Sequence, residues 1–316
     1  MKRIIWKIFS LFCVSIGMSQ VLDARYHSLD EIHTFLDSLD QISEYESFYR
    51  VDTIGYSHQE NRPILAVKIS DNVQVREDEA RVLFIGQVHA EEVIGLEAVL
   101  DLILDLINPE ISNTNHVNIL RANMEIWIIP TVNPEGLTAV HEALDVSYRK
   151  NKRDLSPEGP YSNGIFDYDP SIGNDIDGVD INRNFDFNWT FGDTFLEPDN
   201  SDYAAHYDYY KGETPFSEGE AVAIRDLALR EKFLFSIVWH SSRSGNLSEK
   251  LYTSWLWAAS KVSPDLAYMK SIADDLASEL VKEDGSGTYL SRYSASRNGK
   301  LHDWFYTETG CIQYLI

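Results

Sequence analysis

Short apolar segments typical of β-strands alternate with helical segments along this chain of 316 residues. The apolar segments cover residues 63–69, 81–85, 124–129, 233–239 and 311–316. Helical spacing of apolar residues covers 29–42, where Ser28 and Glu31 form a capping-box pattern, and also 91–107 and 264–281. A strand that is apolar at almost every position is buried on both faces. We therefore expect an α/β fold, a single domain with a central mixed, mostly buried, twisted sheet and helices on both faces.

The first 19 residues have the pattern of a secretory signal peptide. Met1 to Arg3 are followed by a mostly apolar stretch from Ile4 to Met18, with Gly17 and Ser19 before Gln20. A membrane anchor is the alternative, but it needs about 20 apolar residues, and this stretch is shorter and contains a lysine. We expect an exported protein, secreted or periplasmic, monomeric and free of the membrane after cleavage, with its catalytic domain in residues 20–316.

The charge of the chain limits its partners. Fifty acidic side chains against 27 basic ones give a formal net charge of -23. Such a surface repels phosphate backbones and anionic lipid, so nucleic acid is not an expected partner. Cys311 is the single cysteine beyond the signal segment, which excludes an internal disulfide and disfavours a thiolate metal site.

An acidic stretch at residues 167–180 interrupts the alternation of strands and helices. It contains Asp167, Asp169, Asp175, Asp177 and Asp180 among Gly, Pro, Ser and Asn. A solvated loop is the simpler interpretation. Asp175-Ile176-Asp177-Gly178 also offers hard oxygen ligands for Ca²⁺, although the distal glutamate of a full calcium loop is missing.

Two histidines stand at the ends of apolar strands. His89 follows the strand at 81–85, with Glu92 three residues later, and His240 follows the strand at 233–239. A histidine and a glutamate three apart on a first helical turn can point the same way, and ligands collect at the carboxyl ends of strands in open α/β sheets. Two histidines and one carboxylate form a zinc site that leaves a position for water. Taken alone, each histidine would be interpreted as a hydrogen-bonded structural residue.

Further motifs follow in a fixed order, and together they resemble the carboxypeptidase A family of zinc metallopeptidases from about Tyr26 to the last residue. The matching segments are 26–32, 61–64, His89 to Glu92, 132–136, 148–150, 179–185, 215–218, His240-Ser241, 293–296 and Asp303-Trp304. The resemblance implies one zinc ion on His89, Glu92 and His240, which polarises a scissile carbonyl and acidifies a bound water.

The resemblance also implies roles for residues around the metal. Arg149 would stabilise the oxyanion, and Asn182 with Arg183 would hold the free carboxylate of a peptide. Tyr293 would close over the bound terminal residue, and His302 falls at the main specificity position. Without its motif, Arg183 would be interpreted as a surface ion pair with the neighbouring aspartates.

The chain departs from the family pattern in two places. Glu91 stands where well-known members have an arginine, which alters the neighbouring subsites. The general-base glutamate of the family is expected immediately after Ile316, so we expect a catalytic domain that is incomplete at its C-terminal end. Glu308 precedes the last strand, so we do not expect it to replace that base.

We therefore predict a zinc metallocarboxypeptidase that removes C-terminal residues from peptides and proteins. Two alternatives belong to other classes. A zinc deacylase of acyl amino acids would share the three metal ligands but would not need the Asn182-Arg183 motif. A non-catalytic protein could bind zinc and peptide ends without cleaving them.

Overall fold

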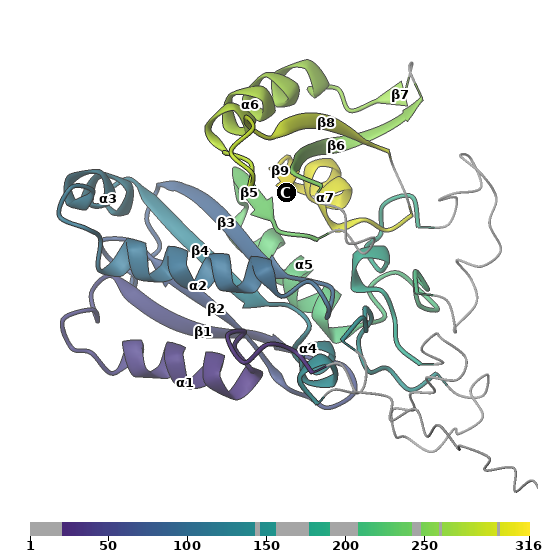
Figure 1. Cartoon of the computed structure of the whole chain (residues 1–316), viewed down its shortest axis with the longest axis horizontal. Coiled ribbons are helices and arrows are strands. Elements are labelled where there is room, and N and C mark those ends of the chain that lie inside the picture. The colour runs from purple at the N-terminus through teal and green to yellow at the C-terminus, as the bar shows by residue number, and fades with distance from the viewer. Residues whose placement is uncertain are drawn as a thin grey trace, which may run out of the picture.

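The computed structural model describes residues 21–142, 146–155, 177–189, 208–241, 248–258, 261–295 and 298–316. Within these ranges nine strands form one sheet, with the order β1-β2-β4-β3-β5-β9-β6-β7 and β8 paired to β6 (Figure 1). Among the described residues no helix is long and apolar enough to span a membrane. The expected α/β fold with one mixed sheet is confirmed.

The centre of the sheet consists of the strands that the apolar segments predict. These are β2 (Pro63–Ile69), β4 (Met124–Thr131), β3 (Ala80–Gln87), β5 (Phe235–Val238) and β9 (Ile312–Leu315). β3 is parallel to both β4 and β5, and β5 is parallel to β9. Parallel pairing puts the carboxyl ends of β3 and β5 at one edge of the sheet, where His89 and His240 follow.

The outer strands are less apolar and were not predicted from the sequence. They are β1 (Tyr49–Tyr56), β6 (Lys250–Ala258), β7 (Lys261–Val262) and β8 (Leu290–Ala295). β1 pairs antiparallel with β2, and β6 pairs antiparallel with β9. An outer strand has one partly solvated face, so it lacks the continuous apolar run that identifies a buried strand.

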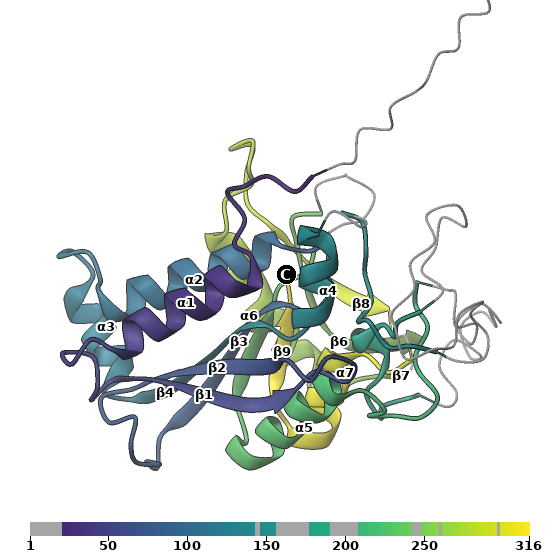
Figure 2. The ribbon, with the colours of Figure 1, turned by 90° about the horizontal axis from the view of Figure 1, so that it is seen from below.

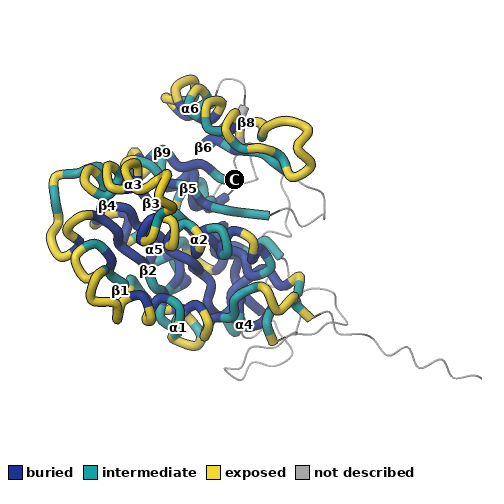
Figure 3. The backbone as a smooth tube through the Cα atoms, turned by 60° about the vertical axis from the view of Figure 1, so that its left-hand side comes forward, coloured by how far each residue is buried: buried dark blue, intermediate teal, exposed yellow. Residues whose placement is uncertain are grey.

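Helices cover both faces of the sheet. One face packs against α1 (Leu29–Asp40), α2 (Ile94–Ile107), α3 (Thr114–Arg121) and α6 (Leu266–Glu279). The other face packs against α5 (Gly219–Glu231) and α7 (Leu301–Trp304), so α1 and α2 lie across the sheet from α5 in Figure 2. The central strands are the most deeply buried part of the backbone (Figure 3).

Local sequence explains where several helices begin. Ser28 and Glu31 form the expected capping box at the start of α1, which satisfies two backbone N–H groups that the first turn leaves open. α4 (Pro134–His141) begins within the 132–136 segment that resembles the family, because Pro134 suits the first turn of a helix and the Asn133 side chain accepts from Gly136 N.

The helix expected to begin at Glu91 begins later. α2 starts at Ile94, so Glu92 lies in the turn between β3 and α2 and the prediction that it occupies a first helical turn is wrong. The turn is closed by the Glu92 N–H, which donates to His89 O at 3.1 Å. The turn brings the two side chains together without a helix.

Candidate metal centre

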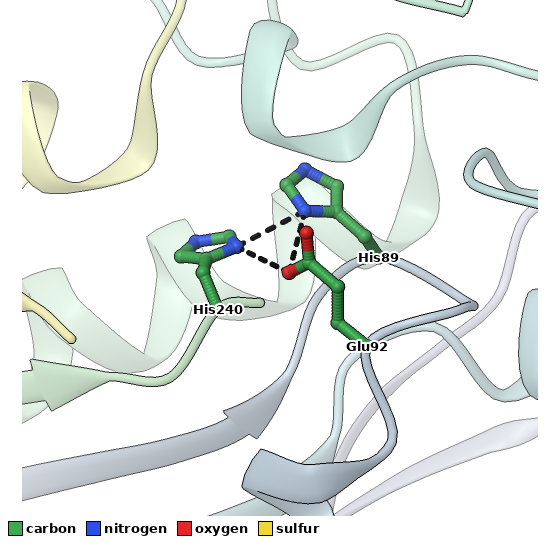
Figure 4. Close-up of side chains that lie close together, drawn as sticks. All are labelled: His89, Glu92 and His240. Carbon is green, nitrogen blue, oxygen red and sulfur yellow. Dashed lines mark hydrogen bonds and ion pairs between the residues drawn. The ribbon is translucent and has the colours of Figure 1, made fainter. Parts of the chain in front are cut away.

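His89 and Glu92, three residues apart, meet the distant His240 at the carboxyl edge of β3 and β5 (Figure 4). His240 Nδ1 lies 3.0 Å from His89 Nδ1 and 2.7 Å from Glu92 Oε2, and His89 Nδ1 lies 2.9 Å from the same Oε2. All three side chains are at least 92% buried. The structure therefore joins the three residues that the sequence predicts as metal ligands.

The electrostatics of these three side chains favour a cation between them. Burial and Arg149 act to lower the pKa of His89, but Glu92 and Asp180 outweigh them and raise it. Burial lowers the pKa of His240 despite the nearby Glu92 carboxylate. Burial opposes ionisation of Glu92, but the two imidazoles outweigh it and lower its pKa. An ionised carboxylate and two imidazole nitrogens are the donor types that zinc takes in catalytic sites.

Asp180 contacts one of the three ligands, His89, on the ring nitrogen that faces away from the other two. Its Oδ1 lies 3.2 Å from His89 Nε2 and accepts from Asn182 N at 2.9 Å, while its Oδ2 accepts from Arg149 Nε at 3.0 Å. A carboxylate on the second nitrogen of a ligating histidine fixes the ring and leaves Nδ1 free to bind a metal. Arg149 and His89 hold the pKa of this fully buried group far below its ordinary value, against the effect of burial.

Asp180 is the site residue that sequence reasoning missed. In the sequence it looks like one of several aspartates in an acidic stretch. Its position two residues before Asn182 was the available indication, because the motif brings the whole Asp180–Arg183 segment to the metal ligands.

Arg149 lies beside the three ligands rather than on the surface. Its Nη1 is 3.5 Å from Glu92 Oε1 and 3.6 Å from Glu91 Oε1. Burial alone would lower its pKa, but Asp180, Glu92 and Glu91 raise it, so the guanidinium stays charged. Burial raises the pKa of Glu91 to about 7.

Asn182 and Arg183 lie in a short 3-10 turn (Ile181–Arg183) next to the ligands. Asn182 Nδ2 is 3.5 Å from His240 Nε2, and its Oδ1 accepts from Leu301 N at 2.9 Å. Arg183 is 91% buried and its Nη1 donates to Asn182 O at 2.9 Å. Among the described residues no acidic side chain forms a salt bridge with Arg183, and this arginine is buried rather than exposed.

Comparison with known proteins places this site in a family. The model of the zinc carboxypeptidase family matches residues 32–316. The chain belongs to this family.

Curated relatives of the chain include zinc carboxypeptidases and an inactive member. Zinc carboxypeptidase A 1 of Anopheles gambiae is 28% identical over 288 residues, which is 89% of this chain and 57% of the relative. The inactive metallocarboxypeptidase ecm14 of Talaromyces stipitatus is 23% identical over 295 residues, or 84% of this chain and 44% of that protein. The chain thus spans about half the length of these relatives.

The crystal structure of carboxypeptidase A from Helicoverpa armigera shares the fold. It superposes with a TM-score of 0.72 at 22% identity, covering 92% of this chain and 64% of that one. The family identifies the expected metal as Zn²⁺, and the residues of this chain fit it: His89, Glu92 and His240 offer converging, buried ligand atoms.

The two remaining predicted site residues are His302 and Tyr293. His302 belongs to α7 and is 99% buried, and burial, Lys300, His240 and Arg183 together lower its pKa well below its ordinary value. Tyr293 lies on β8 opposite Thr253 of β6 and is 46% exposed. The contacts found in the described ranges do not join Tyr293 to the three ligands, so its role stays a prediction.

The suggested calcium loop falls mostly outside the described residues, which omit Asp167, Asp169 and Asp175. The two remaining aspartates have structural partners. Asp177 Oδ1 accepts from Leu155 N at 3.0 Å, and Asp180 supports the zinc ligands. Calcium binding stays untested.

Proposed function

We propose that this protein is a zinc metallocarboxypeptidase that hydrolyses the last peptide bond of peptides and proteins. The observation that supports this best is the placement of two buried arginines, Arg149 and Arg183, on either side of Asp180 in sequence and next to the metal ligands. A metal ligand set alone fits many hydrolases. Two arginines beside it provide charge for both an oxyanion and a substrate carboxylate.

In this proposal His89, Glu92 and His240 would hold zinc, which would supply polarisation of the scissile carbonyl and a lower pKa for a water molecule. Arg149 donates to the oxygen that becomes negative, in a buried site where such hydrogen bonds are strong. Asn182 and Arg183 bind the terminal carboxylate through charge-assisted hydrogen bonds. Asp180 keeps His89 and Arg149 in position, and His302 and Tyr293 contact the terminal side chain.

The general base is a further part of this proposal. His240 N donates to Ile316 O at 2.7 Å, so Ile316 lies beside a metal ligand. This contact supports the proposal that a residue immediately after Ile316 is the glutamate that would act as the general base. Reading the gene beyond the codon for Ile316 tests the assignment: a glutamate codon is expected, and any other residue rejects it.

A second candidate is a protein that binds zinc and peptide ends without cleaving them. It is favoured by the inactive metallocarboxypeptidase among the relatives, which matches 84% of this chain. Turnover of any peptide by the zinc-loaded protein would reject this candidate. Faster turnover of acyl amino acids than of peptides would instead favour the deacylase.

The test of substrate binding is Arg183→Ala. Loss of a charged, buried hydrogen-bond partner costs about 1.5–3 kcal/mol, so affinity for a free-ended peptide should fall by about 10- to 150-fold. The parent protein should show a similar loss when the peptide end is an amide. Calorimetry with the acid and amide forms of one peptide measures both effects.

Arg225→Ala is the matched control, because Arg225 lies on α5 and pairs with the exposed Asp226. It should bind both peptides as the parent does. If the parent binds acid and amide equally well, Arg183 is not a carboxylate clamp and the proposed exopeptidase is wrong.

We further propose that residues 1–19 direct export and are removed, and that the remaining chain acts as a monomer. Mass spectrometry of the protein recovered from outside the cytoplasm should give an N-terminus at Gln20. An intact Met1 in that fraction would reject the cleavage.

A further inference from the structure

One aromatic ring contacts both arginines of the proposed site. The Cζ atoms of Arg149 and Arg183 lie over the Tyr209 ring at 5.0 Å and 5.2 Å from its centroid. Both distances are within the range of a cation–π interaction. Tyr209 is partly buried, whereas the two guanidiniums are almost fully buried, so little water screens these contacts.

Resting on the proposed function, we propose that Tyr209 is a positioning residue that sets the distance between Arg149 and Arg183. It would thereby fix how many residues of a substrate lie between the oxyanion and the terminal carboxylate.

The backbone around Tyr209 is tied to the site. Asp180 N donates to Tyr210 O at 2.8 Å, so the residue whose carboxylate holds Arg149 also anchors the segment that supplies the ring. Asn184 Nδ2 donates to Lys211 O at 2.9 Å, one residue beyond the 3-10 turn that contains Arg183. The ring and both arginines therefore belong to one hydrogen-bonded unit.

The geometry limits the span between the two positive charges. Because both Cζ atoms lie within 5.2 Å of one centroid, they are no more than about 10 Å apart. One residue of extended backbone covers about 3.5 Å, and a hydrogen bond at each end adds about 3 Å. This upper limit leaves room for a single terminal residue between the scissile carbonyl and the carboxylate, whereas two extended residues, at about 13 Å, would be too long.

The ring also opposes the repulsion between the two guanidiniums. Two like charges in a buried site repel each other strongly, and the negative face of an aromatic ring attracts both. An aliphatic side chain would fill the space but would supply no such attraction. The arginines would then separate or turn toward other partners, and the span would change.

The experiment compares Tyr209→Leu and Tyr209→Phe with the parent, all loaded with zinc. Calorimetry measures the affinity for one peptide as its free acid and as its amide. Tyr209→Leu should weaken binding of the acid about tenfold, which corresponds to about 1.4 kcal/mol, and should change binding of the amide less than twofold. Tyr209→Phe keeps the ring face and should bind within twofold of the parent.

Tyr210→Leu is the matched control, because the Tyr210 ring packs beside Leu155 and Val179. It should leave the ratio of acid to amide affinity unchanged. Should Tyr209→Leu fail to fold, Tyr209→Met fills a similar volume without a ring and should show the same loss.

The outcomes separate this inference from the proposed function. A parent that does not discriminate between acid and amide refutes the carboxypeptidase site itself. A parent that discriminates, together with a Tyr209→Leu protein that discriminates equally, refutes only the role of Tyr209. Equal losses in Tyr209→Leu and Tyr210→Leu would also refute it, because they would indicate a general structural effect.

Discussion

Replacing Asp180 by asparagine should weaken zinc binding without altering any zinc ligand. The carboxylate accepts hydrogen bonds at both oxygens, with His89 Nε2 and Asn182 N at Oδ1 and Arg149 Nε at Oδ2. Asparagine has one oxygen and one NH₂ group. In either orientation the NH₂ group faces a donor, so either the His89 ring or the Arg149 guanidinium loses its hydrogen bond to residue 180.

The magnitude follows from the partners that are lost. Loss of the carboxylate behind a ligating histidine typically lowers metal affinity 10- to 100-fold, which is about 1.4–2.7 kcal/mol. The folded protein should also become less stable by about 2–4 kcal/mol, because Arg149 remains buried with one fewer counter-charge. Asp180→Asn should therefore bind zinc more weakly than the parent and unfold at lower urea.

Chelator competition measures the zinc affinity, and urea unfolding of the metal-free protein measures the stability. Asp177→Asn is the control, because this carboxylate is equally buried, lies three residues earlier and accepts from Leu155 N. It should keep zinc affinity within about twofold of the parent, since it is not part of the outer shell of the metal site. If both variants bind zinc as tightly as the parent, Asp180 does not orient His89 and the reasoning is wrong.

Two further predictions concern stability. Burial and the neighbouring Glu135 raise the pKa of Glu220 well above its ordinary value, so its contribution to stability is full below pH 4.5 and is lost as the pH rises through the folded pKa. Glu220→Gln should remove this loss, so the variant should be more stable than the parent at pH 8. Urea unfolding at pH 5 and pH 8 measures the free energy of unfolding, and the same fall between the two pH values in both proteins would contradict the prediction. Gly299→Ala should destabilise by more than Gly285→Ala, because both have positive φ but the new Cβ at Gly299 would lie 1.9 Å from Arg183 O, whereas Gly285 has open space. Equal melting temperatures of the two alanine variants would contradict this, because they would show that the backbone near Arg183 shifts to accept the new Cβ with no loss of stability.

The sequence predicted the central strands and several helices because their signals are local. An apolar run marks a strand that is buried on both faces, and the capping box at Ser28 marks the first residue of α1. Periodicity failed at the start of α2, where it extended the helix back to Glu91. Periodicity depends only on the spacing of apolar residues. The hydrogen bond from Glu92 N to His89 O closes a separate turn before the helix, and this turn does not change that spacing.

The sequence by itself determined the chemistry available to the protein: two histidines and a glutamate after buried strands, two arginines in family motifs, and an α/β fold that gathers strand ends. Only the tertiary structure decided which of these side chains meet. His89 and His240 are 151 residues apart in sequence and become neighbours because β3 and β5 pair in parallel. Asp180 and Tyr209 acquire their places through contacts with Arg149 that no local pattern encodes. Such contacts depend on the packing of the whole chain, since a side chain's partners across the fold are set by the sheet order and not by its neighbours in sequence.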